Sequence, residues 1–432
     1  MSSASSAALI ASIALIAWAA AMRALAGTWL NPSAFFALWW CFAGVLPLIL
    51  APREPVGVNA IVWLVAASIA FSIGALIGNW GFKTRRIANP PPATDRELFV
   101  YGGICLVSVI FGIGSNLAFV AGTPGINYLD LFDIQKLVVV ANQNYLARYD
   151  QLAPPAPALS QMLLPFVYLS PVAGGSLFVL HPKKKWKFLG IVSFVPAVFV
   201  TLLQTTKAAM LFAFILWLSS YFAARLRKGK LAVFTKQHLA IAIGVGGSVT
   251  VLFIAVSLAR MASTDFALLS VVYLKLTTAA LGHMSVFSQY LTTYLDTPIA
   301  PTLGKVTFGG PLEMLGLGHR IPGLFENFIE LVAGETTNIY TGFRPLIDDF
   351  TIPGALVVLA FVGMIGGIGF RLVAAGRWSA VPLLIISYLT IFWTPFTWFW
   401  IYNSLTATVV AVGVMVWLVR VWRGVRYPAP AT

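Results

Sequence analysis

The stretch V-N-A-I-V-W-L-V-A-A-S-I-A-F-S-I-G-A-L-I-G-N-W, residues 58–80, contains no charged residue and decides the fold class. As a helix, it is long enough to cross a hydrocarbon core of about 30 Å. Similar apolar runs of about 20 residues recur along the chain. The 432 residues are 59% hydrophobic and only 10% charged, with a mean hydropathy of +0.87. Because lipid offers no water to the backbone, such runs must be helical. The sequence therefore predicts an all-α polytopic membrane protein, with residues 1–432 as a single integral membrane domain.

The basic residues orient these runs. They concentrate in short connections at 83–96, 183–187, 225–236 and 371–377, and in the C-terminal tail. Positive charge in short connections is typical of the cytoplasmic side, so the N-terminus is expected outside and the C-terminus inside. About 11 transmembrane helices follow, within a range of roughly 10 to 13. The predicted spans lie near 7–26, 33–51, 58–80, 98–121, 159–180, 188–204, 207–224, 239–258, 352–370, 379–395 and 402–420.

Two long segments, 122–158 and 259–351, remain on the outer side and hold most of the 14 acidic residues. Long loops usually carry function, so the outer face is the expected working face. Within the second segment, 266–294 is predicted as an amphipathic helix on the membrane surface or as a pair of short re-entrant helices. Gly323–Ala333 has the apolar spacing of a short amphipathic helix. Gly304–Pro311 has the glycines of a tight loop.

Several function classes are not supported by the chain. The formal charge of +14 follows the membrane topology and does not indicate nucleic-acid binding. No nucleotide-binding motif, zinc motif or nucleophile elbow is found. Cys41 and Cys105 both lie in apolar runs, so no structural disulfide is expected. No cleavable signal peptide and no internal repeat of the kind found in many transporters are evident.

Cationic side chains on the outer side are few and are candidates for binding phosphate. Arginine presents a planar, permanently charged fork that suits phosphate groups. Arg344 is followed by proline, Arg260 lies at the mouth of a span, and Lys207 interrupts a long apolar run. The alternatives are interfacial anchoring, a salt bridge, or a turn whose lysine reaches the head groups. The candidates for binding a diphosphate are Arg344, Arg260, Lys207, Arg320 and Lys305.

The segment E-T-T-N-I-Y-T-G-F-R-P-L-I-D-D-F, residues 335–350, is unusually polar and precedes a predicted span. Asp348 and Asp349 are neighbours, so their side chains should point in different directions. One of them is a candidate base, while the other would cap the helix that begins near Ile352. The further candidate bases are Glu335, His283 and His319, although a single histidine in a loop is more often structural.

Aromatic residues gather in F-W-T-P-F-T-W-F-W-I-Y-N, residues 392–403, between the last two predicted spans. Such a run is typical of the aromatic belt at a membrane interface. The alternative is a platform on which sugar rings stack. Trp398 and Trp400 are therefore candidates for glycan binding, together with Asn338 and Tyr340 of the polar segment.

The run T-N-I-Y-T-G-F-R-P-L-I-D-D-F-T-I-P-G, residues 337–354, resembles the hallmark segment of the bacterial oligosaccharide repeat-unit polymerases, the O-antigen polymerase group. That segment reads T-N-x-Y-T, two variable residues, R-P, and then D-F-G-x-x-G. The stretch G-K-V-T-F-G-G, residues 304–310, is similar to the upstream G-x-x-T-F-G-G of the same family. Thr351 departs from the pattern, because glycine is usual there. The matching residues are Asn338, Tyr340, Thr341, Arg344, Pro345, Asp349, Phe350 and Gly354.

The resemblance implies a glycosyltransferase that joins glycan repeat units linked to undecaprenyl diphosphate at the periplasmic face of the bacterial inner membrane. It implies a large, partly helical extracytoplasmic loop and a fold like that of the lipid-dependent, GT-C-like glycosyltransferases. The donor and acceptor would both be lipid-linked oligosaccharides, and a chain-length regulator in the membrane would be a further partner. No cofactor, metal or nucleic acid is implied. The alternatives are a ligase that transfers finished polymer and an exporter of lipid-linked oligosaccharide.

Overall fold

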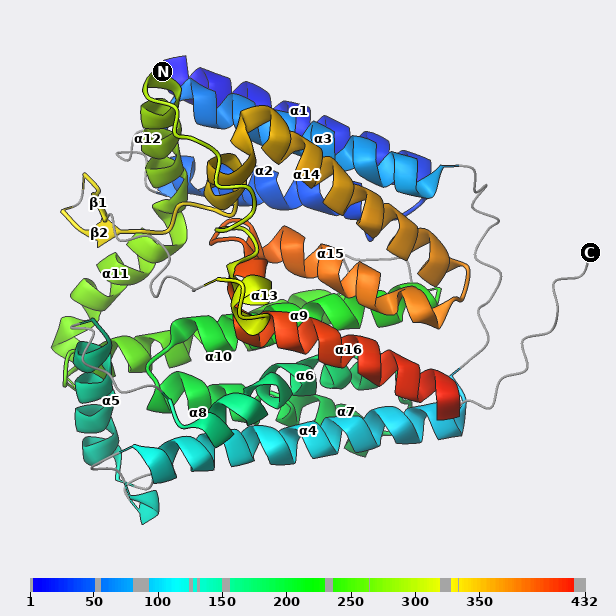
Figure 1. Ribbon diagram of the computed structural model, residues 1–432, viewed down its shortest axis with the longest axis vertical. Helices are drawn as coiled ribbons and strands as arrows, with labels where there is room; N and C mark the ends of the chain where they lie inside the picture. The colour runs from blue at the N-terminus through cyan, green and yellow to red at the C-terminus, as the bar shows by residue number, and fades with distance from the viewer. Residues whose placement is uncertain are drawn as a thin grey trace, which may run out of the picture.

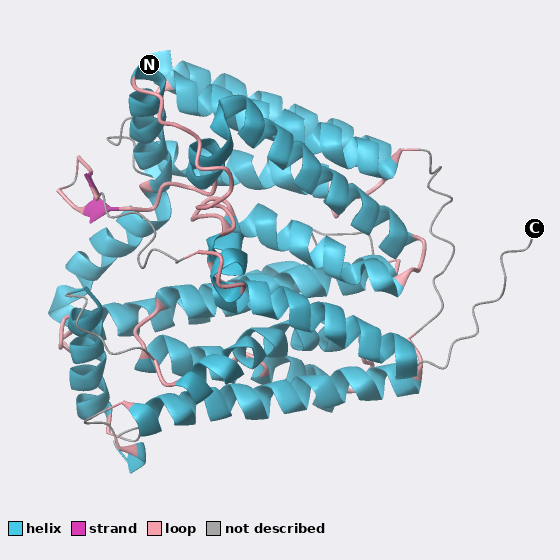
Figure 2. Ribbon diagram, viewed as in Figure 1, coloured by secondary structure: helices cyan, strands magenta, loops and turns pink. Residues whose placement is uncertain are grey.

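The computed structural model describes residues 3–50, 56–80, 93–123, 127–129, 133–149, 156–229, 236–263, 265–318, 328–332 and 334–422. This part of the chain is almost entirely helical (Figures 1 and 2). The α-helices are α1 (Ser3–Ala26), α2 (Pro32–Leu50), α3 (Val58–Asn79), α4 (Asp95–Gly122), α5 (Ile134–Tyr149), α6 (Ala158–Leu180), α7 (Lys184–Val192), α8 (Val195–Leu203), α9 (Lys207–Arg227), α10 (Lys236–Arg260), α11 (Leu269–Leu281), α12 (His283–Asp296), α13 (Gly309–Met314), α14 (Phe343–Ala374), α15 (Val381–Trp393) and α16 (Asn403–Trp422). Short 3-10 turns are η2 (Phe266–Leu268), η3 (Trp378–Ala380) and η4 (Phe399–Ile401).

Within the described residues, eight helices are long and apolar enough to cross a membrane. All eight coincide with predicted spans, which confirms an all-α, multi-pass membrane architecture. The remaining three predicted spans correspond to α2 and to the shorter apolar helices Gly246–Arg260 and Trp378–Trp393. The eight are Ala7–Ala26, Val58–Asn79, Asp95–Gly122, Ala158–Leu180, Lys184–Leu203, Lys207–Arg227, Phe343–Ala374 and Asn403–Val421.

One end of the helical bundle carries the elements of the two long segments. Figure 1 shows α5, α11, α12 and the hairpin of strands β1 (Ile329–Glu330) and β2 (Thr336–Thr337) at the left, at the same end as the start of α1 and opposite the end of α16. The segment 266–294 forms two helices, α11 and α12, which meet at Gly282, in place of one continuous amphipathic helix. These elements form a partly helical layer across the ends of the long helices.

The predicted helix at Gly323–Ala333 is wrong for the part that the structure describes. Strand β1 (Ile329–Glu330) pairs antiparallel with β2 (Thr336–Thr337), with Ile329 opposite Thr337. Gly334 has a φ of +79° and supplies the reversal between them. A tight turn followed by a β-branched pair therefore overrides the helical spacing of the apolar residues. Residues 323–327 lie outside the described part of the chain.

The opposite end of the bundle buries an ion pair. Arg227 at the end of α9 donates two hydrogen bonds to the Glu97 carboxylate of α4, the second at 2.8 Å. The guanidinium lies 3.2 Å from the ring centroid of Trp378. Glu97 and Arg227 are 1% and 4% exposed, so Arg227 is buried and joins α4, α9 and η3.

Helices α3 and α14 pack against each other more extensively than any other pair of described elements. Their backbones meet at glycines spaced four residues apart, Gly74 and Gly78 on α3 and Gly363 and Gly367 on α14. A Cβ atom on Gly363 would lie 2.0 Å from the Phe71 carbonyl oxygen. Small residues at this spacing allow transmembrane helices to approach closely. This close crossing holds α14 in place, and the first turns of α14 carry Arg344 and Asp348.

Helix α14 is interrupted at Thr351, whose φ of +63° and ψ of 175° are not helical. A β-branched residue is strained in this region, which glycine adopts freely. Thr351 is the position at which the polymerase segment usually has glycine, so the structure supplies a backbone reason for that preference. The break separates the turns that carry Arg344 and Asp348 from the remainder of the helix.

Replacing Thr351 with glycine is expected to stabilise the fold by about 1 kcal/mol, because the strain of a positive φ is relieved. The measurement is thermal unfolding of the purified protein in detergent. Thr292→Gly, at an exposed position within α12, is the matched control and should cost about 0.5 kcal/mol. If both variants lose stability equally, the break at Thr351 stores no strain.

Candidate functional site

Arg344 lies in the first turn of α14 between two tyrosine rings. Its guanidinium carbon is 4.0 Å from the ring centroid of Tyr340 and 5.0 Å from that of Tyr290 in α12. The two rings are close to perpendicular, at 81°, and 6.2 Å apart. Cation–π contacts of this kind hold a guanidinium in place without neutralising its charge. The rings of Tyr340 and Tyr290 therefore position the Arg344 guanidinium, which is only partly exposed to solvent.

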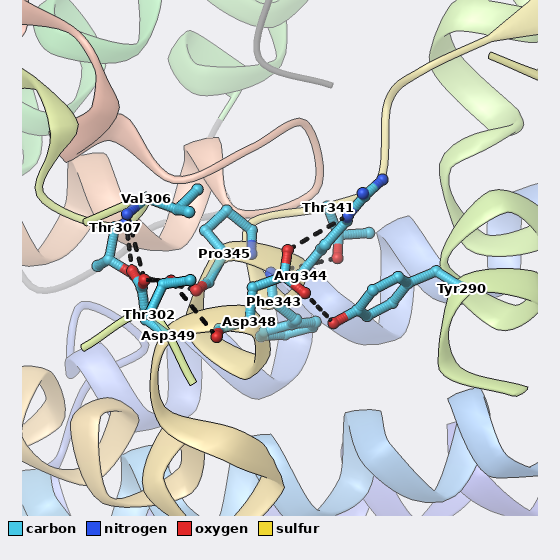
Figure 3. Close-up of polar contacts among 10 residues, drawn as sticks. All are labelled: Tyr290, Thr302, Val306, Thr307, Thr341, Phe343, Arg344, Pro345, Asp348 and Asp349. Atoms are coloured by element: carbon cyan, nitrogen blue, oxygen red, sulfur yellow. Dashed lines mark hydrogen bonds and ion pairs between the residues drawn. The ribbon is translucent and has the colours of Figure 1, made fainter. Parts of the chain in front are cut away.

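Asp348 lies one helical turn after Arg344 and contacts both Arg344 and Tyr290 (Figure 3). Its Oδ2 is 3.4 Å from Arg344 Nε, and its Oδ1 accepts a 2.6 Å hydrogen bond from the Tyr290 hydroxyl. Burial and the Asp348 carboxylate raise the pKa of Tyr290 well above its usual value, so the hydroxyl keeps its proton and remains the donor. Asp348 itself is only 6% exposed. A carboxylate, an arginine and a tyrosine thus form one compact polar cluster.

Asp349 points away from this cluster, as expected for the neighbour of Asp348 (Figure 3). Its carboxylate accepts hydrogen bonds from the Thr302 hydroxyl and from the backbone N–H groups of Val306, at 3.2 Å, and Thr307. The side chain is fully buried. Asp349 therefore binds the loop at residues 302–308, the glycine loop, in place of forming the predicted cap on the helix near Ile352. This leaves Asp348 as the carboxylate that faces Arg344.

The glycine loop also contacts the backbone of the polar segment. The N–H groups of Thr302 and Leu303 donate to the carbonyl oxygens of Asp348 and Asp349, both at 3.1 Å. Gly304 has a φ of +92°, so the predicted tight loop is present and leads into α13. The two stretches that resemble the polymerase family therefore bind each other directly.

The other candidate bases lie elsewhere. Glu335 lies in the β1–β2 hairpin, where its carbonyl oxygen accepts the Leu331 N–H at 2.8 Å. His283 is buried beside Trp40, with Nδ1 3.0 Å from the Ala280 carbonyl oxygen. Burial lowers the pKa of His283 to about 4, which makes it a weak base. His319, like the candidate cation Arg320, lies outside the described residues.

A second group of cations lies where α9, α10 and α11 meet. Arg260 donates from Nε, at 3.0 Å, and from Nη2 to the carbonyl oxygen of Thr205, just before α9. Its guanidinium carbon lies 4.7 Å from the ring centroid of Tyr145 in α5. Lys207 begins α9 and lies close enough to Arg260 and Lys275 to be repelled by both. Of the remaining candidate cations, Lys305 is exposed on the glycine loop.

The predicted glycan-binding residues are divided between the core and the site. Trp398 is 1% exposed and packs beside Phe399, so its ring is covered by protein. Trp400 and Asn338 are partly exposed, while Tyr340 forms one wall around Arg344. Trp398 therefore acts as a core residue, which neither the aromatic-belt nor the sugar-platform interpretation anticipated.

The aromatic run at residues 392–403 contacts both the residue before α14 and α9. The N–H of Gly342, directly before α14, donates to the Thr394 carbonyl oxygen at 2.6 Å. Phe212 of α9 packs against Trp393 and Tyr402, with ring centroids 3.8 and 5.1 Å apart. The aromatic run thus joins the start of α14 to the helix that begins at Lys207.

Among the described residues, no three His, Cys, Asp or Glu side chains are grouped closely enough to hold a metal ion. Tyr290 was not predicted from the sequence, because a tyrosine in an amphipathic helix carries no distinguishing signal. Comparison with protein-family models, curated proteins and solved structures gives no match for this chain. The functional argument therefore depends on the site itself.

Proposed function

We propose that the protein is a polysaccharide polymerase that joins glycan repeat units carried on undecaprenyl diphosphate. The observation that carries the proposal is the cluster of Arg344, Asp348 and Tyr290. Arg344 and Asp348 lie within the segment that resembles the O-antigen polymerases, and Tyr290 of α12 binds Asp348 from outside it. The proposal includes about eleven spans, a GT-C-like arrangement and a site on the periplasmic side of a bacterial inner membrane.

The reaction requires a leaving group and a base. The bond between the anomeric carbon of the growing chain and its lipid diphosphate breaks, and its electron pair goes to the diphosphate oxygen. The acceptor sugar hydroxyl forms the new bond to that carbon and gives its proton to Asp348. Arg344 stabilises the negative charge that develops on the diphosphate, which counts most where water is excluded. Tyr290 keeps Asp348 oriented by its hydrogen bond.

Arg260 and Lys207, which belong to the second group of cations, are proposed to attract the lipid diphosphate to the protein. Both of their charges lie beside the start of α9, and Lys275 adds a third. Several cations held together raise the local concentration of an anionic substrate. A chain-length regulator in the same membrane would be the protein partner of the polymerase.

The test is a gel of surface polysaccharide from a strain that lacks this protein. A polymerase defect leaves single repeat units on the surface lipid, and the ladder of longer chains returns when the gene is restored. Complete loss of surface glycan would instead identify a ligase or an exporter. An unchanged ladder would contradict all three functions.

A further inference from the structure

An exposed apolar strip runs along the outer segment between α12 and α14. The strip consists of large side chains that are 38% to 79% exposed, although they lie outside every helix that could span a membrane. Large exposed apolar side chains gathered in one segment indicate a contact with another molecule or with lipid. The members of the apolar strip are Ile299, Leu303, Phe308, Met314, Leu315 and Leu317.

The other face of this segment is fixed to the protein. A Cβ on Gly310 in α13 would lie 2.7 Å from the Trp400 carbonyl oxygen and 3.0 Å from Thr406 Oγ1. Asn403, the first residue of α16, donates a hydrogen bond to the Glu313 carboxylate. Because α13 is held against the end of a membrane-crossing helix, its outward side lies at the depth where that helix leaves the membrane.

The apolar strip contacts a membrane-crossing helix that also exposes apolar side chains. The ring of Phe308 meets that of Phe350 edge to face, with centroids 6.5 Å apart. Beyond the break at Thr351, Val357 and Phe361 lie one helical turn apart on α14 and are 68% and 56% exposed. Val410 on α16 is 60% exposed. The loop that carries Phe308 therefore packs against the start of a membrane-crossing helix that exposes large apolar side chains further along.

We propose that the apolar strip rests in the outer leaflet of the bilayer, with Leu303, Leu315 and Leu317 among the acyl chains. The exposed Lys305 lies within the same segment and fits the level of the lipid phosphates. Asp349 accepts hydrogen bonds from the loop that carries Leu303 and Phe308. The part of the protein proposed to contact lipid is therefore bound directly to the segment that carries Arg344. This inference does not depend on which glycan, or whether any glycan, is the substrate.

The test measures the environment of single labels on the full chain in phospholipid nanodiscs. Cys41 and Cys105 are buried, so an introduced exposed cysteine can be labelled selectively, and the unchanged chain measures the background. A bimane label is placed at Leu315→Cys or Leu303→Cys. Phe361→Cys serves as the lipid-facing reference. Thr336→Cys, exposed in the hairpin that projects at the left of Figure 1, serves as the aqueous reference.

Labels at 315 and 303 should be quenched by nitroxide-labelled lipid to at least about half the extent seen at 361, and iodide should quench them weakly. The label at 336 should show the reverse. Quenching at 315 and 303 by iodide equal to that at 336 would overturn the proposal, because the strip would then face water. Protection from both quenchers would also overturn it, because a second copy or another protein would then cover the strip.

Discussion

A protein in which Asp348 is replaced by asparagine should lose polymer synthesis by about 10²-fold or more, since a positioned base contributes roughly that factor. Asparagine keeps the shape of the side chain, and its carbonyl oxygen can still accept the Tyr290 hydroxyl. The change therefore removes the charge that would take the acceptor proton while preserving the main contact. The measurement is the ladder of surface polysaccharide in a strain whose only copy of the protein is Asp348→Asn.

Asp296→Asn is the matched control, because Asp296 is an exposed carboxylate at the end of α12. Both variants should reach equal levels in the membrane by immunoblot, and Asp296→Asn should produce a normal ladder. A normal ladder from Asp348→Asn at equal level would exclude Asp348 as the base. Asp349→Asn is not an equivalent test, because that carboxylate holds the glycine loop and its loss should lower the stability of the fold.

Patterns that depend on periodicity and length were predictable from the sequence. The run at 58–80 and its counterparts became helices because lipid allows the backbone no other partner. The segment at 335–350 was recognisable as a candidate site because polar residues there stand out against an apolar chain. The opposite orientations of Asp348 and Asp349 followed from their adjacency alone. These inferences use local rules, which tertiary contacts rarely reverse.

Contacts between distant parts of the chain were not predictable in the same way. Tyr290 reaches Asp348 because α12 packs across the start of α14, and nothing in residues 283–296 signals that pairing. Trp398 looked like an interfacial aromatic residue, but the turn before α16 places it in the core. The partners of Asp349 lie more than forty residues earlier in the chain. Such roles depend on which elements meet, and spacing within one element does not contain that information.

Replacing Gly363 with alanine is expected to destabilise the protein by about 3 kcal/mol, because overpacking a close backbone contact forces the helices apart. The added Cβ would lie 2.0 Å from the Phe71 carbonyl oxygen of α3, and the nearest atoms are all backbone. No rotamer change can relieve that clash, so α14 must move relative to α3. Thermal unfolding in detergent should show a lower midpoint, together with a smaller yield of folded protein from membranes.

Gly413→Ala provides the matched control, because Gly413 lies in α16 with nothing within 4 Å of its added Cβ. At this position alanine should raise stability by about 0.5–1 kcal/mol, since it favours the helix and meets no obstacle. The two substitutions are chemically identical, so the opposite signs expected for their changes in stability come only from the surroundings of the two glycines. If Gly363→Ala were as stable as Gly413→Ala, the close crossing of α3 and α14 would not exist. The first turns of α14 would then lack the support that holds Arg344 and Asp348 in place.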